Sequence, residues 1–432
     1  MKYIYNFSRK TAFHLLKIFF ILYMYTNLKF FIIFRTQYLI LKSKNQKPYK
    51  GLAFGRSIFN EDIKAINTFS KFISIDTIDK SILGESLKIM MEKSGITNPL
   101  SNIENYHQDN QQRKVLKRFT EILLKPIIKK NNYQFLISGN YNYLELQEIH
   151  NLAKDLSLPY IILYKEGISL NKKTFKRNNN PYLKIPFKAD KLITYNEEIK
   201  KSFLSSKIDG INKKNIIAHG IPRFDFIFMK STPKKIYKST FFSPYPPDKI
   251  NFYDNSHENI LIEKINDFHI DFIETVNQFK KHQFIIKTKS ADHYKNYVMD
   301  LFDKVDIDKF PENLIISSQI NSQKLMTESE TICGFNSTTL IEAILMEKPI
   351  ITLSVKNITN LQDNILLSLN DQTSFWKDFG FFSKYFNSEI KIPSIKKNTE
   401  LSNLIHTLKG DSSLRVESEI IKSIKEIKSE HA

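Results

Sequence analysis

The stretch from Glu330 to Leu353, which reads E-T-I-C-G-F-N-S-T-T-L-I-E-A-I-L-M-E-K-P-I-I-T-L, decides the fold of this chain. A short apolar run ends at Cys333 and is followed by Gly334 and a cluster of hydroxyl residues. An apolar helical stripe comes next, and a β-branched run begins after Pro349. This order predicts a strand, a tight turn, a helix and a second strand, which together make a βαβ unit.

The predicted helix of this unit begins at Ser337, Thr338 and Thr339. Hydroxyl side chains at a helix start cap the first backbone N–H groups, and the helix dipole favours a negative charge there. The turn is therefore a candidate phosphate site. Glu342 follows within the first turns, so we expect its carboxylate to accept hydrogen bonds from the hydroxyls of a sugar.

Length and composition indicate a globular protein of two domains. A chain of 432 residues is too long for one ordinary core, and 41% hydrophobic and 13% aromatic residues suffice for two domains of roughly 150–200 residues. The single cysteine, Cys333, excludes an intramolecular disulfide and a cysteine-based zinc site. Its place at the end of an apolar run predicts a core residue and not a nucleophile.

The net charge of +19 raises the question of an acidic partner. The surplus is mostly lysine spread over the whole length, and no helix-turn-helix, zinc-finger or RNP-like signature accompanies it. We therefore expect no nucleic-acid partner. An acidic membrane surface or a phosphorylated substrate is compatible with the charge.

Residues 1–48 are expected to form a membrane-associating segment outside both domains. The range from Leu15 to Phe34 is rich in Phe, Ile, Leu and Tyr, but Lys17, Asn27 and Lys29 interrupt it. A clean transmembrane helix needs about 20 apolar residues, so an interfacial helix or hairpin fits better. This predicts a peripheral or monotopic protein on the cytoplasmic side of the inner membrane.

Residues 49–230 have the pattern of a Rossmann-like α/β domain. Apolar runs alternate with helical stripes, such as the one from Leu144 to Leu156. The predicted strands are Gly51–Gly55, Phe72–Ile78, Tyr133–Ser138, Pro159–Leu163, Lys191–Thr194 and Asn215–Ala218. Lys165 and Glu166 follow a predicted strand, where open α/β sheets bind ligands, so Glu166 is the first candidate for a general base. His219 lies in a comparable loop and is the second.

The proline-rich range of residues 231–254 is the predicted linker, and a second domain spans residues 255–400. Its strands are expected at Phe284–Lys287, Leu314–Ser317 and Glu330–Cys333. The first of these ends in K-T-K, so that Lys287 and Lys289 are candidates for contact with phosphate. Residues 401–432 have a helical period.

The string from Gly334 to Pro349 resembles the donor-binding segment of GT-B glycosyltransferases, in particular the pattern G-[FY]-x-S-T-x-x-x-E-A-x-x-x-x-[KR]-P of bacterial surface carbohydrate and capsular polysaccharide proteins. In that family the Gly and hydroxyl residues approach the diphosphate of a nucleotide-linked donor, and the Glu contacts its ribose. The resemblance assigns donor binding to Gly334, Asn336, Ser337, Thr338, Thr339 and Glu342.

A second string, H-G-I-P-R-F-D from His219 to Asp225, is similar to the G-x-P-R-x-D turn near the end of the first domain in these proteins. The resemblance implies that Gly220, Arg223, Asp225 and Lys165 line a cleft. It also implies that the last helix crosses back to the first domain.

The resemblance implies a GT-B-like fold, with two Rossmann-like domains facing a cleft after an N-terminal apolar helical segment. The implied activity is glycosyl transfer from a nucleotide-sugar to a surface polysaccharide or a lipid-linked acceptor, without a cofactor or a metal. A possible metal motif, D-I-D at Asp306–Asp308, lies in a lysine-rich stretch and is not expected to bind metal.

Three alternatives stay open. A polyol-phosphate transferase of the CDP-glycerol type uses histidines in H-G and K-x-H-P settings; this chain has His219-Gly220, and Lys289 stands where some relatives have the second histidine. A UDP-sugar 2-epimerase-like enzyme would need further His and acidic residues around the base and the sugar. A non-catalytic glycan-assembly protein would keep Glu342 without a working base in the first domain.

Overall fold

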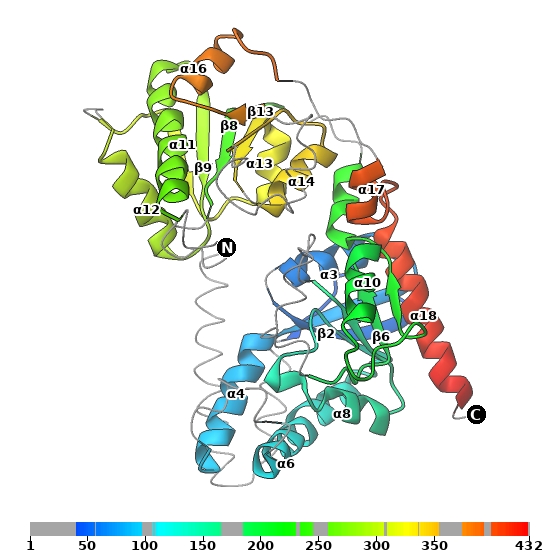
Figure 1. The fold of residues 1–432 in the computed structure, drawn as a ribbon. Helices are drawn as coiled ribbons and strands as arrows, with labels where there is room; N and C mark the ends of the chain where they lie inside the picture. The colour runs from blue at the N-terminus through cyan, green and yellow to red at the C-terminus, as the bar shows by residue number, and fades with distance from the viewer. Residues whose placement is uncertain are drawn as a thin grey trace. The chain divides into compact units, whose positions relative to one another are not determined.

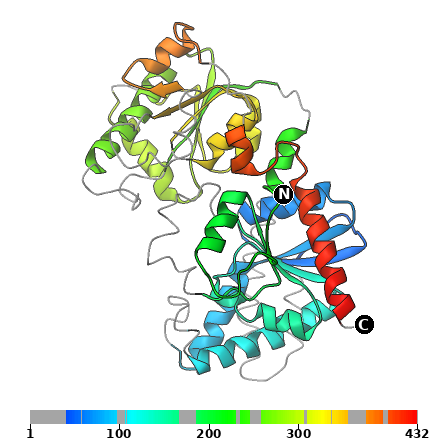
Figure 2. The same ribbon diagram turned by 45° about the vertical axis from the view of Figure 1, so that its right-hand side comes forward.

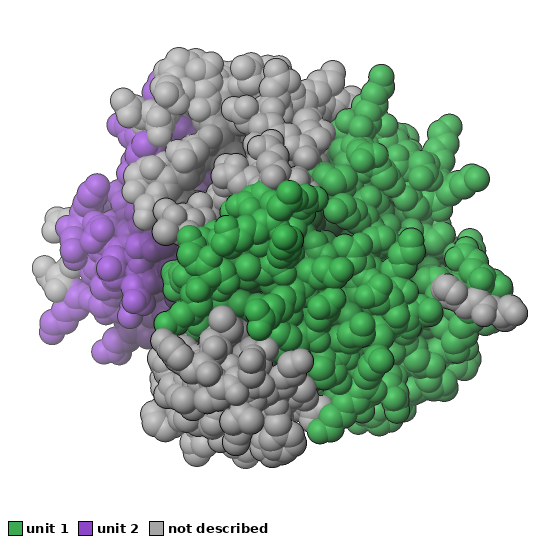
Figure 3. Space-filling model, turned by 90° about the horizontal axis from the view of Figure 1, so that it is seen from below, with its two compact units in different colours: residues 1–228, 402–432 green, residues 229–401 purple. Residues whose placement is uncertain are grey.

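The computed structural model describes residues 40–56, 58–96, 106, 109–165, 185–229, 234–244, 258–305, 309–335, 337–353, 374–392 and 399–430. The chain forms two compact units, which Figure 3 distinguishes by colour. Unit 1 consists of Met1–Phe228 and Ser402–Ala432, and unit 2 of Met229–Leu401. The predicted apolar segment of residues 15–34 lies outside the described residues. Among the helices that the structure describes, none has the length and apolarity needed to cross a membrane.

Unit 1 contains a seven-stranded sheet in the order β1-β3-β2-β4-β5-β6-β7. All neighbours are parallel except β1, which pairs antiparallel with β3 at the edge. The strands are β1 (Ile40–Leu41), β2 (Tyr49–Gly55), β3 (Ile73–Asp79), β4 (Phe135–Ser138), β5 (Tyr160–Leu163), β6 (Lys191–Thr194) and β7 (Ile216–Ala218). The predicted strands are thus present. β1, however, lies within residues 1–48, so the start of the sheet belongs to a range that was expected to lie outside it.

The helices of unit 1 follow its strands, as Figures 1 and 2 show. They are α3 (Ile58–Phe69), α4 (Lys80–Lys93), α6 (Asn110–Phe119), the π-helical turn η1 (Thr120–Leu124), α7 (Lys125–Lys130), the 3-10 turn η2 (Leu144–Leu146), α8 (Ile149–Asp155), α10 (Glu197–Ser205), the 3-10 helix η4 (Pro222–Phe228) and α18 (Ser412–Glu430). The stripe from Leu144 to Leu156 forms η2 and α8. α17 (Thr399–Ile405) contains the boundary between the two units.

The last helix, α18, packs on α3 and η4 of unit 1. Its buried stripe includes Val416, Ile420 and Ile424, which recur at the spacing of one helix face. Figures 1 and 2 show α18, in red, along one side of the unit. The predicted return of the chain to its first domain is confirmed.

Unit 2 contains a six-stranded parallel sheet in the order β10-β9-β8-β11-β12-β13. The strands are β8 (Tyr237–Phe242), β9 (Gln283–Lys287), β10 (Leu314–Ser317), β11 (Ser329–Gly334), β12 (Ile350–Leu353) and β13 (Ser374–Trp376). The helices are α11 (Glu258–Gln278), α12 (Asp292–Phe302), α13 (Ser322–Glu328), α14 (Thr338–Leu345) and α16 (Phe381–Phe386). The βαβ unit predicted from Glu330 to Leu353 is β11, α14 and β12.

The prediction that residues 231–254 form a linker is wrong in part. The strand β8 lies inside this range and pairs with β9 and β11 in the centre of the sheet. Prolines stand on both sides of the strand, at Pro233 and Pro244, and they made the whole range resemble a linker. The six residues of β8 itself, Y-K-S-T-F-F, contain no proline and are half aromatic, which suits a strand.

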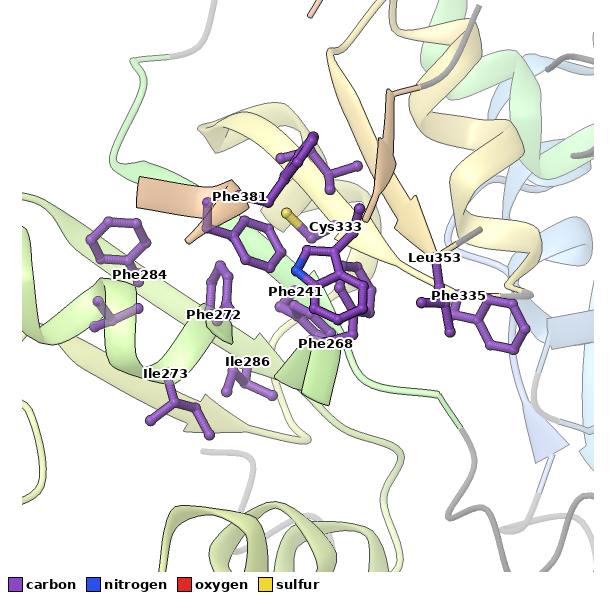
Figure 4. Packing of buried hydrophobic residues seen from close by; sticks show 14 of the residues in the cluster. Phe241, Phe268, Phe272, Ile273, Phe284, Ile286, Cys333, Phe335, Leu353 and Phe381 are labelled. Carbon is purple, nitrogen blue, oxygen red and sulfur yellow. The ribbon is translucent and has the colours of Figure 1, made fainter. Parts of the chain in front are cut away.

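Aromatic side chains fill the core of unit 2 (Figure 4). Phe241 of β8 packs against Phe268 and Phe272 of α11, with ring centroids 4.8 and 5.1 Å apart. Cys333 is fully buried in the same cluster, and burial raises the pKa of its thiol to about 12. The predicted core role of Cys333 is confirmed, because a thiol that stays protonated is a poor nucleophile.

Candidate functional site

The strand order indicates at which edge of each sheet a ligand would be expected. In unit 2, β9 and β10 follow β8 on one side, and β11, β12 and β13 continue on the other, which is the Rossmann order 3-2-1-4-5-6. The order reverses between β8 and β11, and ligands of open α/β sheets bind outside the carboxyl ends of the strands at that point. In unit 1 the parallel strands have the order β3-β2-β4-β5-β6-β7, so the corresponding point lies between β2 and β4.

The switch point of unit 2 brings the β11–α14 turn next to the end of β8. Gly334, the last residue of β11, is the register partner of Phe242, the last residue of β8. A Cβ on Gly334 would lie 3.1 Å from the carbonyl oxygen of Phe242, so the glycine allows β8 and β11 to pack closely. The close packing of β8 and β11 therefore explains why a glycine occupies position 334, without reference to a ligand.

The hydroxyl residues of this turn have the predicted capping role. Ser337 is the N-cap of α14, and its Oγ accepts from the backbone N–H of Thr339 at 3.3 Å. The Ser337 and Thr339 hydroxyls are 2.6 Å apart, while Thr338 is exposed. Asn336 lies outside the described residues. The N-terminus of α14 thus begins at the switch point, with a dipole that favours an anion.

Glu342 is buried, with 7% of its surface exposed, and its Oε2 accepts from Nε2 of Gln323 at 3.2 Å. Gln323 lies in the first turn of α13 and Glu342 in the second turn of α14. Glu342 is thus more deeply buried than expected for a residue whose carboxylate is to contact a ligand. Its orientation is therefore fixed by a neighbouring helix, which suits a group that has to meet a ligand hydroxyl.

Lys287 and Lys289 extend from the carboxyl end of β9. The ammonium group of Lys287 donates to the carbonyl oxygens of Thr288 (2.7 Å) and Ser318 (3.1 Å), and burial lowers its pKa. Within the described residues, no carboxylate lies within ion-pair distance of Lys287. Lys289 is exposed, and its ammonium lies 5.5 Å from the ring centroid of Tyr294. Lys287 is therefore a hydrogen-bonded and partly desolvated positive charge at the carboxyl edge of the unit 2 sheet.

Ser243, which follows β8 at the switch point, was not among the residues predicted from the sequence. Its Oγ lies 3.0 Å from Nε2 of His269, a residue of α11 that is completely buried. The His269 Nδ1 is 2.7 Å from the carbonyl oxygen of Ile265, which only accepts, so Nδ1 carries the proton and Nε2 accepts from Ser243. Burial lowers the pKa of His269 to about 4, which keeps the ring neutral.

Ser243 is thereby an oriented hydrogen-bond acceptor. Its proton points to His269, which is closer than the alternative acceptor, the Pro244 carbonyl at 3.5 Å. The oxygen lone pairs are left for a donor such as a sugar hydroxyl. A signal existed in the sequence, a serine directly after a strand, but the strand itself had been assigned to the linker.

At the carboxyl edge of unit 1, an ion pair joins α4, which follows β3, to the 3-10 turn η2, which follows β4; β3 and β4 are the two neighbours of β2. Lys80 Nζ and Glu145 Oε1 are 2.5 Å apart, and both side chains are largely buried. The ammonium also lies 3.8 Å from the ring centroid of Tyr143. This acid–base pair was not predicted from the sequence, because 65 residues separate its members.

Lys165 lies at the same edge of unit 1. Its backbone N–H donates to the Gly139 carbonyl at 3.0 Å, and its side chain covers Gly139, where a Cβ would lie 2.9 Å from the Lys165 Cδ. Glu166, the first candidate base, lies outside the described residues, and its role stays a prediction.

The residues from His219 to Asp225 contact the last helix, α18. Gly220 has a φ of +88°, and a Cβ there would lie 2.3 Å from the Ser412 Oγ. The Asp225 carboxylate accepts from the backbone N–H groups of Ser412 (3.1 Å) and Ser413 (2.7 Å), at the start of α18. His219 Nε2 is 3.8 Å from Glu419 Oε2 of the same helix. Gly220 and Asp225 were expected to line a cleft, and His219 was the second candidate base; in the structure each of the three contacts α18, and the role of His219 as a base stays a prediction.

Arg223, from the same string, is buried against α3 and the end of β6. Its Nη1 lies 3.1 Å from both carboxylate oxygens of Asp62 and 2.8 Å from the Tyr195 hydroxyl, which itself donates to Asp62 at 2.5 Å. Asp62, Tyr195 and Arg223 are at most 3% exposed. A buried and fully paired guanidinium has a structural role, so the structure gives no support to Arg223 as a ligand contact.

Lys348, the basic residue of the K-P pair that ends the α14 string, lies at the amino edge of the unit 2 sheet. Its ammonium donates to the carbonyl oxygens of Ser329 (2.6 Å) and Thr327 (3.2 Å), where α13 ends. Lysine is well suited to the carbonyls of a helix C-terminus. Burial, and then the nearby Lys235, lower the pKa of Lys348 to about 7.

This pKa predicts a pH dependence of stability. The unfolded chain holds the Lys348 proton up to a pH near 10.4, whereas the folded chain releases it near 7, so the free energy of unfolding should rise from pH 7 to pH 10. The rise should be smaller in Lys348→Met. Urea unfolding at both pH values measures it through Trp376, the single tryptophan, which lies in unit 2. An equal rise in both proteins would assign the effect to other groups.

Among the described residues, no group of three or more His, Cys, Asp or Glu side chains is arranged to hold a metal ion.

Comparisons with known proteins give structural neighbours and no sequence family. No family model matches the chain, and no curated protein matches its sequence. The solved structures that resemble it include UDP-GlcNAc 2-epimerase from Neisseria meningitidis bound to UDP-GlcNAc, with 12% identity and a TM-score of 0.48 over 86% of this chain and 100% of that chain. The enzyme from Methanocaldococcus jannaschii has 14% identity and a TM-score of 0.45, over 86% and 99%. A putative UDP-N-acetylglucosamine 2-epimerase from Listeria monocytogenes has 10% identity and a TM-score of 0.49, over 88% and 98%.

Proposed function

We propose that this chain is an enzyme acting on a nucleotide-activated sugar, whose diphosphate binds at the carboxyl edge of the unit 2 sheet. The observation that carries the proposal is the position of α14, which begins at the switch point of a sheet with the Rossmann strand order. Lys287 supplies positive charge at the same edge, and Ser243 and Glu342 supply acceptors whose orientation their neighbours fix.

For the reaction, we propose epimerisation of the UDP-sugar 2-epimerase type as the first candidate and glycosyl transfer as the second. Epimerisation needs groups that remove and return a proton, and it needs no acceptor. The Glu145–Lys80 pair at the carboxyl edge of unit 1 is of this acid–base kind. Glycosyl transfer, the activity expected from the resemblance, remains the second candidate, because the same diphosphate site would serve a donor sugar.

Solvent exchange distinguishes the two reactions. In deuterium oxide, an epimerase that breaks the C–H bond at carbon 2 returns a solvent deuteron to it, so the proton signal of that carbon should disappear from the NMR spectrum of UDP-GlcNAc. A transferase without an acceptor would leave this signal intact. UDP-GlcNAc is chosen because it is the ligand named in one of the similar structures; GDP-, CMP- and CDP-linked sugars complete the panel.

Glu342→Ala tests the donor site. Loss of a hydrogen bond to a charged group costs roughly 1–3 kcal/mol, so nucleotide-sugar affinity should fall about 5- to 150-fold in calorimetric titration. Glu312→Ala is the matched control, because Glu312 is an exposed carboxylate just before β10, at the opposite edge of the same sheet. Wild-type affinity in folded Glu342→Ala would show that this residue does not contact the ligand.

A further inference from the structure

Exposed basic side chains are concentrated on α6 and α7, at residues 110–130. This stretch contains seven basic residues and one acidic residue, Glu121. An even distribution of the net charge of +19 over 432 residues would give 21 residues a charge of only about +1. The charge is therefore concentrated here. The exposed basic residues are Arg113, Lys114, Lys117, Arg118, Lys129 and Lys130.

The opposite face of the same helical stretch is buried in unit 1. Val115, Phe119, Leu123 and Ile127 recur every four residues and are all buried. A spacing of four drifts by about 40° per step on an α-helix of 3.6 residues per turn. The π-helical turn η1 takes up this drift, and it lies just before Pro126, whose ring cannot continue a regular helix. The basic face is therefore held outward by the packing of the apolar face.

These cations have few countercharges. Lys125 lies 3.9 Å from Asp155, and Arg113 contacts the amide oxygen of Asn110. In the part of the chain that the structure describes, no carboxylate lies within ion-pair distance of Lys114, Lys117, Arg118, Lys129 or Lys130. The face borders α4, against which α6 packs (Figure 1). An exposed cluster of cations with few countercharges fits a surface of negative charge.

We propose that the outer face of α6, η1 and α7 docks this protein on an anionic membrane surface. Stable membrane attachment usually requires two signals, such as an apolar anchor and a basic patch. The sequence supplies an apolar stretch at Leu15–Phe34, and this helical stretch supplies the basic patch. A nucleic-acid partner is less well matched, because the exposed residues of the face include no aromatic side chain on which a base could stack.

Vesicle sedimentation tests this surface in the full chain. The triple variant Lys114→Gln, Lys117→Gln, Arg118→Gln should bind vesicles of phosphatidylcholine with 30% phosphatidylglycerol on the order of 100-fold more weakly than wild type, since each basic residue near an anionic surface contributes roughly fivefold. All three residues are exposed, so the variant should fold normally. Binding of the wild type should decrease at high salt and on pure phosphatidylcholine.

The matched control is Lys201→Gln, Lys213→Gln, Lys214→Gln, which removes the same charge from exposed positions elsewhere in unit 1. Its binding should stay within about twofold of wild type, because these residues lie outside the basic face. If both triple variants lose vesicle binding equally, the effect depends only on net charge, and the proposal is overturned. Wild-type binding in the Lys114, Lys117 and Arg118 variant would also overturn it, as would tighter binding of wild type to duplex DNA than to the vesicles.

Discussion

Arg223→Met is expected to lower the free energy of unfolding of unit 1 by about 3–5 kcal/mol, the usual cost of removing one partner of a buried ion pair. The Asp62 carboxylate would stay buried with its charge, keeping only the Tyr195 hydroxyl and the Arg223 backbone N–H as donors. Urea unfolding followed by far-UV circular dichroism measures the change. The fluorescence of Trp376 reports on unit 2 and serves as the reference.

The double variant Asp62→Asn, Arg223→Met is the control for charge. It removes both members of the ion pair, so it should recover a large part of the lost stability. If the double variant is as unstable as Arg223→Met alone, the cost comes from lost packing and not from an unpaired carboxylate.

The second large effect is expected from Glu417→Ala. The Glu417 Oε1 accepts from three successive backbone N–H groups, those of Lys71, Phe72 and Ile73, at 2.8, 2.5 and 3.1 Å. These donors lie between α3 and β3, so one side chain fixes α18 to the sheet. Its removal should cost about 2–4 kcal/mol, because each donor loses a charged acceptor and water reaches the site only in part. Loss of helical signal from α18 at low urea concentration would accompany it.

Glu426→Ala is the matched control in the same helix. Its side chain is 45% exposed and lies 3.7 Å from Lys191, a surface ion pair that is expected to contribute at most about 1 kcal/mol. Equal destabilisation by both variants would contradict the special role of Glu417.

The sequence predicted most of the parallel strands because their signals are local. Runs such as Phe135–Ser138 and Tyr160–Leu163 are buried on both faces and are therefore mostly apolar. β8 was not predicted, and the reason is equally local. Its six residues lie among prolines and lysines, and these are the most frequent residue types in residues 231–254. β1 failed because two residues give no periodicity.

The candidate site was predictable where its parts are adjacent in the chain. Gly334, the capping residues and Glu342 lie within nine positions of the chain, and the structure has them at the end of β11 and in the first two turns of α14. The Ser243–His269 pair spans 26 residues and depends on the position of α11 across the sheet. The sequence pattern contained no information on that distance.

The string from His219 to Asp225 is a case in which residue types alone suggested a ligand site. Its residue types suit a ligand site, and the resemblance assigned it to one, but the partners of Asp225 are Ser412 and Ser413, almost 190 residues away. Charged residues that hold a returning helix and charged residues that hold a ligand have the same appearance in a single sequence. The tertiary position of α18 decides between them.

Backbone amide exchange with and without UDP-GlcNAc tests the central claim most directly, because it locates a ligand on the chain. A nucleotide-sugar at the switch point of unit 2 should slow the exchange of amides in residues 334–342, at the start of α14, and in residues 287–289, at the end of β9. Slower exchange confined to unit 1, or unchanged exchange at ligand concentrations that calorimetry shows to be saturating, would contradict the assignment of the nucleotide-sugar site to this edge of the sheet.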